Sequence, residues 1–159
     1  MDEDPAARDP LESAPEVFLA DEQDLPVDDS RLVSLARHAL LSQNVPASAE
    51  LSVLLIGEEH MRRLNARFAG NDYATDVLSF PLMEGEEEGP LVLGDIVVCP
   101  AVAAKNAERL GHSQTEEMDT LLVHGLLHIL GHDHQGAEDK AAMEERLALI
   151  LRSFDPARA

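Results

Sequence analysis

The sequence predicts one small α+β domain, in which about five helices pack against a sheet of about four strands. Short apolar, β-branched runs alternate with longer segments whose apolar residues have helical spacing. A chain of 159 residues, 45% of them hydrophobic, can also bury one substantial core. We therefore expect a single domain over residues 15–155. Residues 1–14, rich in Asp, Pro and Ala, are expected to form a disordered acidic segment.

Four short runs predict the strands, because they combine apolar character with flanking turn residues. They are Glu16–Ala20, Glu50–Ile56, Val77–Phe80 and Leu91–Cys99. Pro81 is expected to stop the third strand, and Gly94 and Asp95 to interrupt the fourth. The acidic stretch Glu84–Gly89 between them is expected to be a mobile loop without a ligand site.

Helical spacing of apolar residues and the residues that flank it predict the helices. They are a helix from Asp28-Asp-Ser30 to about Gln43, Glu58–Phe68, residues 101–110, Thr120–Leu130 and Ala137–Ser153. The fourth of these is apolar on nearly every side, which indicates a buried helix.

Composition excludes several classes of protein. No run of 18 apolar residues is present, so we expect no membrane span. The acidic N-terminus lacks the apolar segment of an ordinary signal peptide. The single cysteine, Cys99, cannot form an internal disulfide, and a small core residue is its expected role rather than a metal ligand. Cytoplasmic localisation follows as the expectation.

The net charge of −19 is unusual for a protein that handles nucleic acid, because phosphate binding depends on Lys and Arg. The charge is uneven: residues 1–30 hold eleven acids and one base, whereas Arg62, Arg63 and Arg67 cluster without an acid before Asp72. These arginines form either a selective docking face for RNA or an ordinary solvated helix face.

Four of the seven histidines fall within eleven residues. His124 and His128 are four apart in the apolar run, so both imidazoles lie on one helix face and can reach one metal ion. Gly131 is expected to end the helix and turn the chain, which can bring His134 round as a third ligand. His132, between the turn and that ligand, is not expected to bind the metal.

Three neutral imidazoles favour zinc, and we expect one Zn²⁺ per chain. A site with three protein ligands keeps a position for water, which indicates catalysis rather than a structural role. Zinc lowers the pKa of its water to about 7 and so provides a nucleophile at neutral pH.

The spacing matches the metzincin peptidase pattern H-E-x-x-H-x-x-G-x-x-H at every position but one. The exception is Gly125, which stands where those peptidases have their glutamate general base. The sequence therefore predicts a metzincin-like three-histidine metal site while disfavouring a peptidase. Met143 has the helical spacing of an ordinary core residue rather than of a metzincin methionine turn.

Two segments together resemble one family. Thr75-Asp-Val-Leu-Ser-Phe-Pro81 and His124-Gly-Leu-Leu-His-Ile-Leu-Gly-His-Asp-His134 are similar to the YbeY family of bacterial metal-dependent endoribonucleases. The resemblance implies a zinc-dependent hydrolase of single-stranded RNA, acting in 3′-end maturation of small-subunit rRNA and in ribosome quality control. It implies His124, His128 and His134 as the metal ligands. The implied partners are rRNA, the small ribosomal subunit and assembly factors, with no DNA or membrane.

The functional arginine of that family does not carry over. In the alignment with the family pattern, Ala69 stands at its position, and Ala74 stands where a proline usually precedes the threonine. Arg67 is our candidate for the phosphate contact instead. Asp133 is our candidate for a residue that orients a ligating imidazole, although it could as well cap the turn.

Two other classes of function stay open. One is a ribosome-assembly binding factor whose zinc mainly holds the fold, which Ala69 and the acidic body favour. The other is a zinc hydrolase of another substrate class, including a peptidase. The sequence also leaves open whether the nucleophile is water or the 2′-hydroxyl of the RNA.

Overall fold

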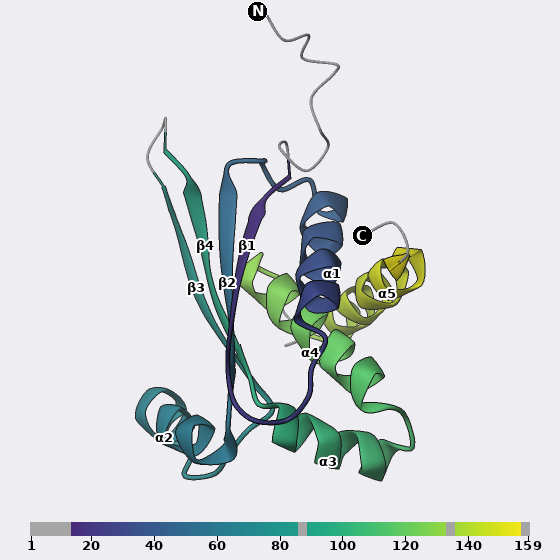
Figure 1. Cartoon of the computed structure of the whole chain (residues 1–159). Helices are drawn as coiled ribbons and strands as arrows, with labels where there is room; N and C mark the ends of the chain where they lie inside the picture. Colours follow the sequence, from purple (N-terminus) through teal and green to yellow (C-terminus); the bar gives the residue numbers. More distant parts are fainter. Residues whose placement is uncertain (1–13, 86–88, 133–135, 157–159) are drawn as a thin grey trace, which may run out of the picture.

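The fold of the protein is known from a computed structural model, which describes residues 14–85, 89–132 and 136–156. Its elements, in chain order, are β1 (Glu16–Glu22), α1 (Asp29–Ser42), β2 (Ala49–Ile56), α2 (Glu58–Ala69), β3 (Val77–Gly85), β4 (Leu91–Val98), α3 (Pro100–Leu110), α4 (Gln114–Ile129) and α5 (Ala137–Ser153). The predicted α+β class, with four strands and five helices, is confirmed in these ranges (Figure 1). The predicted disordered segment lies outside the described residues, apart from Ala14.

The four strands form one mixed sheet in the order β1-β2-β4-β3. β1 pairs parallel to β2, and β2 parallel to β4, whereas β3 pairs antiparallel to β4. β3 therefore lies at an edge of the sheet, with β4 as its neighbour.

The prediction that Pro81 stops the third strand is wrong, because β3 continues to Gly85. An edge strand tolerates proline, since its missing N–H need not be used by a neighbouring strand. Pro81 pairs with Gly94 of β4, and the register then shifts before Glu84 pairs with Val92. This bulge, in which Met83 has a φ of 49°, absorbs the irregularity.

The predicted interruption of the fourth strand is also wrong, because β4 runs continuously through Gly94 and Asp95. The pairing of β4 with β2 instead shifts by one residue at Leu93. A one-residue shift changes the face to which a side chain points, and Leu93 is buried in the core. A glycine is required next to it, since a Cβ on Gly94 would lie 2.3 Å from the carbonyl oxygen of Phe80.

The two faces of the sheet carry different helices (Figure 1). α1 and α4 cover one face over the main hydrophobic core, and α5 packs outside against both. α2 covers part of the other face over a smaller cluster of buried residues: Ile56, Met61, Val97 and Cys99. Burial raises the pKa of the Cys99 thiol, in agreement with its interpretation as a core residue. Met143 of α5 is likewise buried in the main core.

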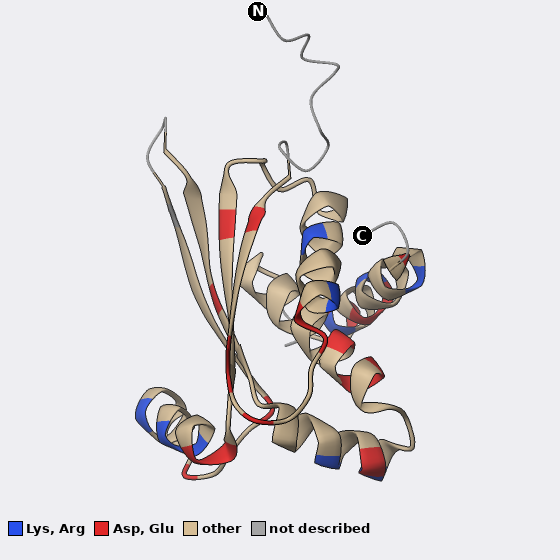
Figure 2. Ribbon diagram, viewed as in Figure 1, with Lys and Arg blue, Asp and Glu red and all other residues tan. Residues whose placement is uncertain are grey.

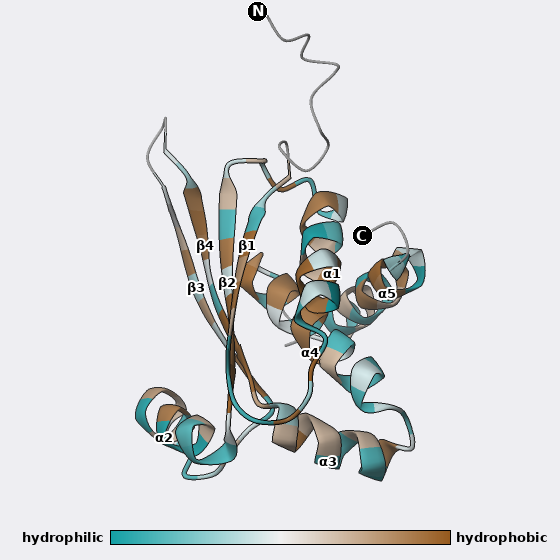
Figure 3. Cartoon of the chain, in the orientation of Figure 1, coloured by the Kyte–Doolittle hydropathy of each residue, from teal (hydrophilic) through white to brown (hydrophobic). Residues whose placement is uncertain are grey.

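α4 is the central helix of the domain. It contacts β3, β4, α1, α3 and α5, and Figure 3 shows hydrophobic residues along much of its length. It begins at Gln114, six residues before the predicted start, because Ser113 and Glu116 form a capping box at its N-terminus. None of the helices in the described ranges has both the length and the apolar character that a bilayer crossing needs.

Candidate metal centre

Two of the three predicted metal ligands lie near the C-terminal end of α4. His124 is half-buried and His128 is exposed, while the residues between them, Gly125, Leu126 and Leu127, are buried. The spacing of four residues places the two imidazoles on one face of α4, one turn apart. A buried helix holds these two imidazoles on a rigid support.

The chain turns back directly after this helix. Gly131 has a φ of 94°, a left-handed conformation that suits glycine. Its N–H donates to the His128 carbonyl, and the N–H of His132 donates to the Leu127 carbonyl, at 3.0 Å each. These two bonds form a Schellman motif, and the predicted helix end at Gly131 is confirmed.

The third predicted ligand, His134, and the candidate catalytic residue Asp133 lie outside the described residues. Their roles therefore stay predictions. Within the described ranges, no three His, Cys, Asp or Glu side chains gather in a geometry that could hold a metal ion. His132 is described: burial, together with the nearby charge of Arg146, lowers its pKa.

Gly125, in the position of the peptidase glutamate, faces the sheet. A Cβ added to it would lie 3.0 Å from Ser79 Oγ, 3.1 Å from Ile96 Cγ2 and 3.4 Å from Val77 Cγ2. Three side chains of β3 and β4 thus occupy the direction in which any larger residue would project. A glutamate at this position would have to enter the packed contact between helix and sheet, so the missing general base has a steric reason.

A hydrogen bond joins β3 to α4 at the same place. The hydroxyl of Ser79 donates to the carbonyl oxygen of Gly125 at 3.2 Å. That carbonyl belongs to the helix turn between His124 and His128. The sheet therefore contacts the histidine turn both by close packing and by a directional bond.

Charged and polar side chains hold the other end of α4. The amide of Asn106, on α3, donates to Asp76 at 3.1 Å and to Glu117 at 3.4 Å, and His112 Nε2 lies 2.8 Å from the second oxygen of Glu117. Asp76 also accepts from the N–H of Val77 at 2.7 Å. This network connects the start of β3 with α3 and the first turns of α4.

Arg31 of α1 makes a bidentate ion pair with Asp119 on the next part of α4. Nη2 of Arg31 donates to Oδ2 at 2.7 Å, and Nη1 donates to Oδ1. The hydrogen bond with Asp119 raises the pKa of Arg31. Both partners are largely withdrawn from solvent, so the pair fixes α4 against α1.

Comparisons with known proteins agree with the resemblance seen in the two motifs. The family model described as Endoribonuclease YbeY matches residues 18–155. The chain belongs to the YbeY endoribonuclease family. A protein named Endoribonuclease YbeY from Thermobifida fusca is 46% identical over 149 residues, which cover 87% of this chain and 96% of that protein. One of the same name from Salinispora tropica is 42% identical over 90% of this chain and 98% of its own length.

A solved structure supports the same relationship. The solution structure of TM1509 from Thermotoga maritima matches with a TM-score of 0.57 and 25% identity, over 86% of this chain and 89% of that one. The fold of the YbeY-family chain thus has an experimentally determined counterpart.

Arg67, the other candidate catalytic residue, lies in the last turn of α2. Its guanidinium carbon lies 5.2 Å from the centroid of the Phe68 ring. α2 is across the sheet from α4, so the structure does not bring Arg67 and the two histidines together on one face (Figure 1). The phosphate contact of Arg67 stays a prediction. Ala69 ends the same helix.

The neighbouring Arg62 differs from Arg67. Arg62 is bound by two acids: it donates to Glu59 at 3.0 Å and to Asp72 at 2.7 Å. Its role on α2 is therefore that of an ordinary solvated ion pair. Figure 2 shows Lys and Arg on the helices and acidic residues alone among the charged residues of the strands.

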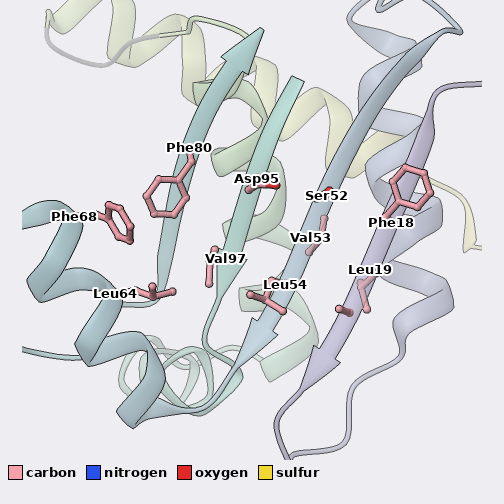
Figure 4. Close-up of a pocket in the computed structure, with 11 residues that line it drawn as sticks. Phe18, Leu19, Ser52, Val53, Leu54, Leu64, Phe68, Phe80, Asp95 and Val97 are labelled. Carbon is pink, nitrogen blue, oxygen red and sulfur yellow. The ribbon is translucent and has the colours of Figure 1, made fainter. Parts of the chain in front are cut away.

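A groove formed by the described residues lies on the face of the sheet away from α4, and nothing in the sequence interpretation predicted it. It has a volume of about 640 Å³ and lies over the face of the sheet that α2 partly covers (Figure 4). Its lining includes Phe18, Phe68, Phe80, Leu54 and Asp95. The alternation of apolar residues in β1 and β3 contained a signal for it, since both put a phenylalanine on the face opposite the core.

Proposed function

We propose that this chain is a zinc-dependent endoribonuclease of single-stranded RNA that acts in 3′-end maturation of small-subunit rRNA and in ribosome quality control, in the cytoplasm. Its partners are then rRNA, the small ribosomal subunit and assembly factors. The observation that carries the proposal is the presence of His124 and His128 on one face of a buried helix, in a chain of the YbeY endoribonuclease family. Curated relatives that match nearly their whole length are named for this activity.

The donor chemistry of the described part of the site fits zinc. Two imidazoles one turn apart match the ligand type and spacing of zinc sites, and the Schellman turn redirects the chain toward His134. His124, His128 and His134 would hold one ion. When bound, zinc supplies a Lewis acid for phosphoryl oxygens and a nucleophile at neutral pH.

The residues of the chain have separate tasks in this proposal. α4 keeps both imidazoles oriented, because its buried sides are packed and its N-terminal end is fixed by Arg31 and Glu117. Asp133 orients a ligating imidazole by accepting its ring N–H. Arg67 binds an RNA phosphate and positions the strand.

A ribosome-assembly factor with a mainly structural zinc is the second candidate function. The observation that favours it is the lack of a cation at position 69, together with the location of Arg67 across the sheet from α4. Efficient phosphodiester cleavage needs positive charge near the phosphate. A peptidase is disfavoured further by the direction of Gly125, which faces the sheet.

The deciding experiment is cleavage of a single-stranded rRNA 3′-end fragment by the full chain. The protein is stripped with a chelator and tested before and after addition of one equivalent of zinc. We expect cleavage only after addition of zinc, and none with His128→Ala. The matched control is His60→Ala, which removes a histidine of α2 and should leave cleavage intact.

The outcomes separate the candidates. Zinc uptake without cleavage by the wild type would support the assembly factor. Cleavage that persists in His128→Ala, or in the stripped protein, would contradict a metal-dependent site on α4. Loss of cleavage in Arg67→Ala, with zinc binding retained, would support the phosphate contact.

A further inference from the structure

We propose that Ser79 is a positioning residue of the candidate metal centre. Its hydroxyl acts through a hydrogen bond to the backbone of Gly125, which has no side chain to keep Ser79 away. The inference rests on the proposed zinc site at His124, His128 and His134. Ser79 does not touch the ion or the RNA in this proposal. It acts through the backbone of α4.

The pattern of β3 assigns this role. Val77 and Ser79 point toward α4, where side-chain atoms of both lie within 3.4 Å of a Cβ added at Gly125. Leu78 and Phe80, which alternate with them, pack against the cluster on the opposite face of the sheet. Ser79 is thus a partly buried polar residue on the side of the strand that faces α4.

The partner of Ser79 lies at the histidine turn itself. Its hydroxyl donates at 3.2 Å to the carbonyl of Gly125. Gly125 directly follows His124, in the helix turn that ends at His128. Nonpolar packing alone is not directional, whereas a hydrogen bond prefers one distance and one angle. The bond therefore determines the position of this turn along and about the axis of α4.

Gly125 makes the bond possible. A Cβ on this residue would lie 3.0 Å from Ser79 Oγ and 3.1 Å from Ile96 Cγ2, so these side chains would have to shift by a few tenths of an ångström. Ser79 and Gly125 consequently form a matched pair. Next to His124 the chain therefore has a glycine that contacts Ser79, where the metzincin pattern has a glutamate.

The consequence is a specific effect on metal binding. Metal ligands must be held within about 0.5 Å of their binding geometry. Loss of the Ser79 bond releases the turn that carries both described ligands, while the polar contacts at the other end of α4 remain. Metal affinity should then decrease more than the stability of the fold.

The experiment compares Ser79→Ala with Ser52→Ala in the full chain. Ser52 lies on β2 of the same sheet and lines the groove on the face opposite α4. Ser52→Ala is therefore the matched control, because it also removes one serine hydroxyl from the sheet but on the other face. Affinity for Co²⁺ and Zn²⁺ is measured by chelator competition, and ligand geometry by the visible spectrum of the Co²⁺ form. Unfolding of the metal-free proteins in urea measures the fold.

We expect the dissociation constant for the metal to rise about two- to tenfold in Ser79→Ala, as for the loss of one hydrogen bond, with an altered Co²⁺ spectrum. Ser52→Ala should leave both unchanged. Wild-type affinity and spectrum in Ser79→Ala would overturn the positioning role, while the proposed function would stand if the wild type binds zinc and cleaves RNA. A wild type that binds neither ion would overturn both.

The contact itself has a test that needs no metal. Gly125→Ala should be less destabilising in the Ser79→Ala background than alone, because the closest contact of the new methyl group is then removed. Additive effects of the two substitutions on the urea midpoint would contradict the matched pair.

Discussion

The two ends of α4 are held in different ways. At its N-terminal end, charged and amide side chains connect it to α1, α3 and the start of β3 through Asp119, Glu117 and Asn106. Near its C-terminal end, Gly125 lets the side chains of Ser79, Ile96 and Val77 approach α4 closely, and the Ser79 hydroxyl makes the one hydrogen bond described there. The first end depends on long polar side chains, and the second on close packing against a glycine.

This difference is compatible with the proposed metal site. In the proposed site, the imidazoles of His124 and His128 bind the ion. Close packing at Gly125 holds this turn of α4 against β3 and β4. The ion pairs and polar network at the other end then supply stability without occupying the histidine turn. Substitutions at the two ends should therefore affect different properties.

The largest expected effect is that of Gly125→Glu. The new side chain would enter the contact with Ser79 and Ile96, and a carboxylate would be buried there without a partner. We expect the free energy of unfolding in urea to fall by about 3 kcal/mol or more, with no gain of casein hydrolysis.

The control for this variant is Gly57→Glu. No atom lies within 4 Å of a Cβ added at Gly57, so the same substitution should cost little there. A folded Gly125→Glu protein that digests casein would contradict the described role of Gly125, because position 125 would then face the metal and not the sheet.

Arg31→Met tests the N-terminal end of α4. It leaves the carboxylate of Asp119, whose side chain is 10% exposed, without its bidentate partner. We expect a loss of about 2–3 kcal/mol of unfolding free energy, with unchanged affinity of the folded protein for zinc. Urea unfolding and chelator competition measure the two quantities.

Arg37→Met is the matched control. Arg37 lies 3.9 Å from Glu16, whose side chain is 59% exposed, and such pairs contribute less than about 1 kcal/mol. A large decrease in zinc affinity in Arg31→Met would show that the two ends of α4 are not separable.

Gly131→Ala should have the smallest effect on stability. No neighbouring atom opposes a Cβ at this residue, so the cost arises from its φ of 94° alone and should be about 1 kcal/mol. Because the turn leads toward His134, zinc affinity should decrease as well. Gly111→Ala is the matched control: its φ is 77° and no atom opposes a Cβ there, so it should cost a similar amount of stability but leave zinc affinity unchanged. Equal zinc affinities of the two variants would contradict a role for the turn at Gly131.

Local patterns were sufficient for most of the elements. Apolar periodicity and end signals predicted the five helices and four strands in their order, although α4 begins earlier and β3 ends later than predicted. The same periodicity placed His124 and His128 on one helix face. The left-handed turn at Gly131 followed from the ordinary chemistry of helix ends. These properties depend on neighbours in the chain, so the sequence alone contains them.

The tertiary structure decided the rest, because it depends on which segments meet. Pro81 is tolerated inside β3 because β3 is at the edge of the sheet. Local periodicity does not predict the order of the strands. The same holds for the separation of Arg67 from α4 by the sheet. The sequence shows that position 125 is not a glutamate. Only the tertiary structure gives a steric reason, because the side chains of Ser79 in β3 and Ile96 in β4 approach Gly125 closely.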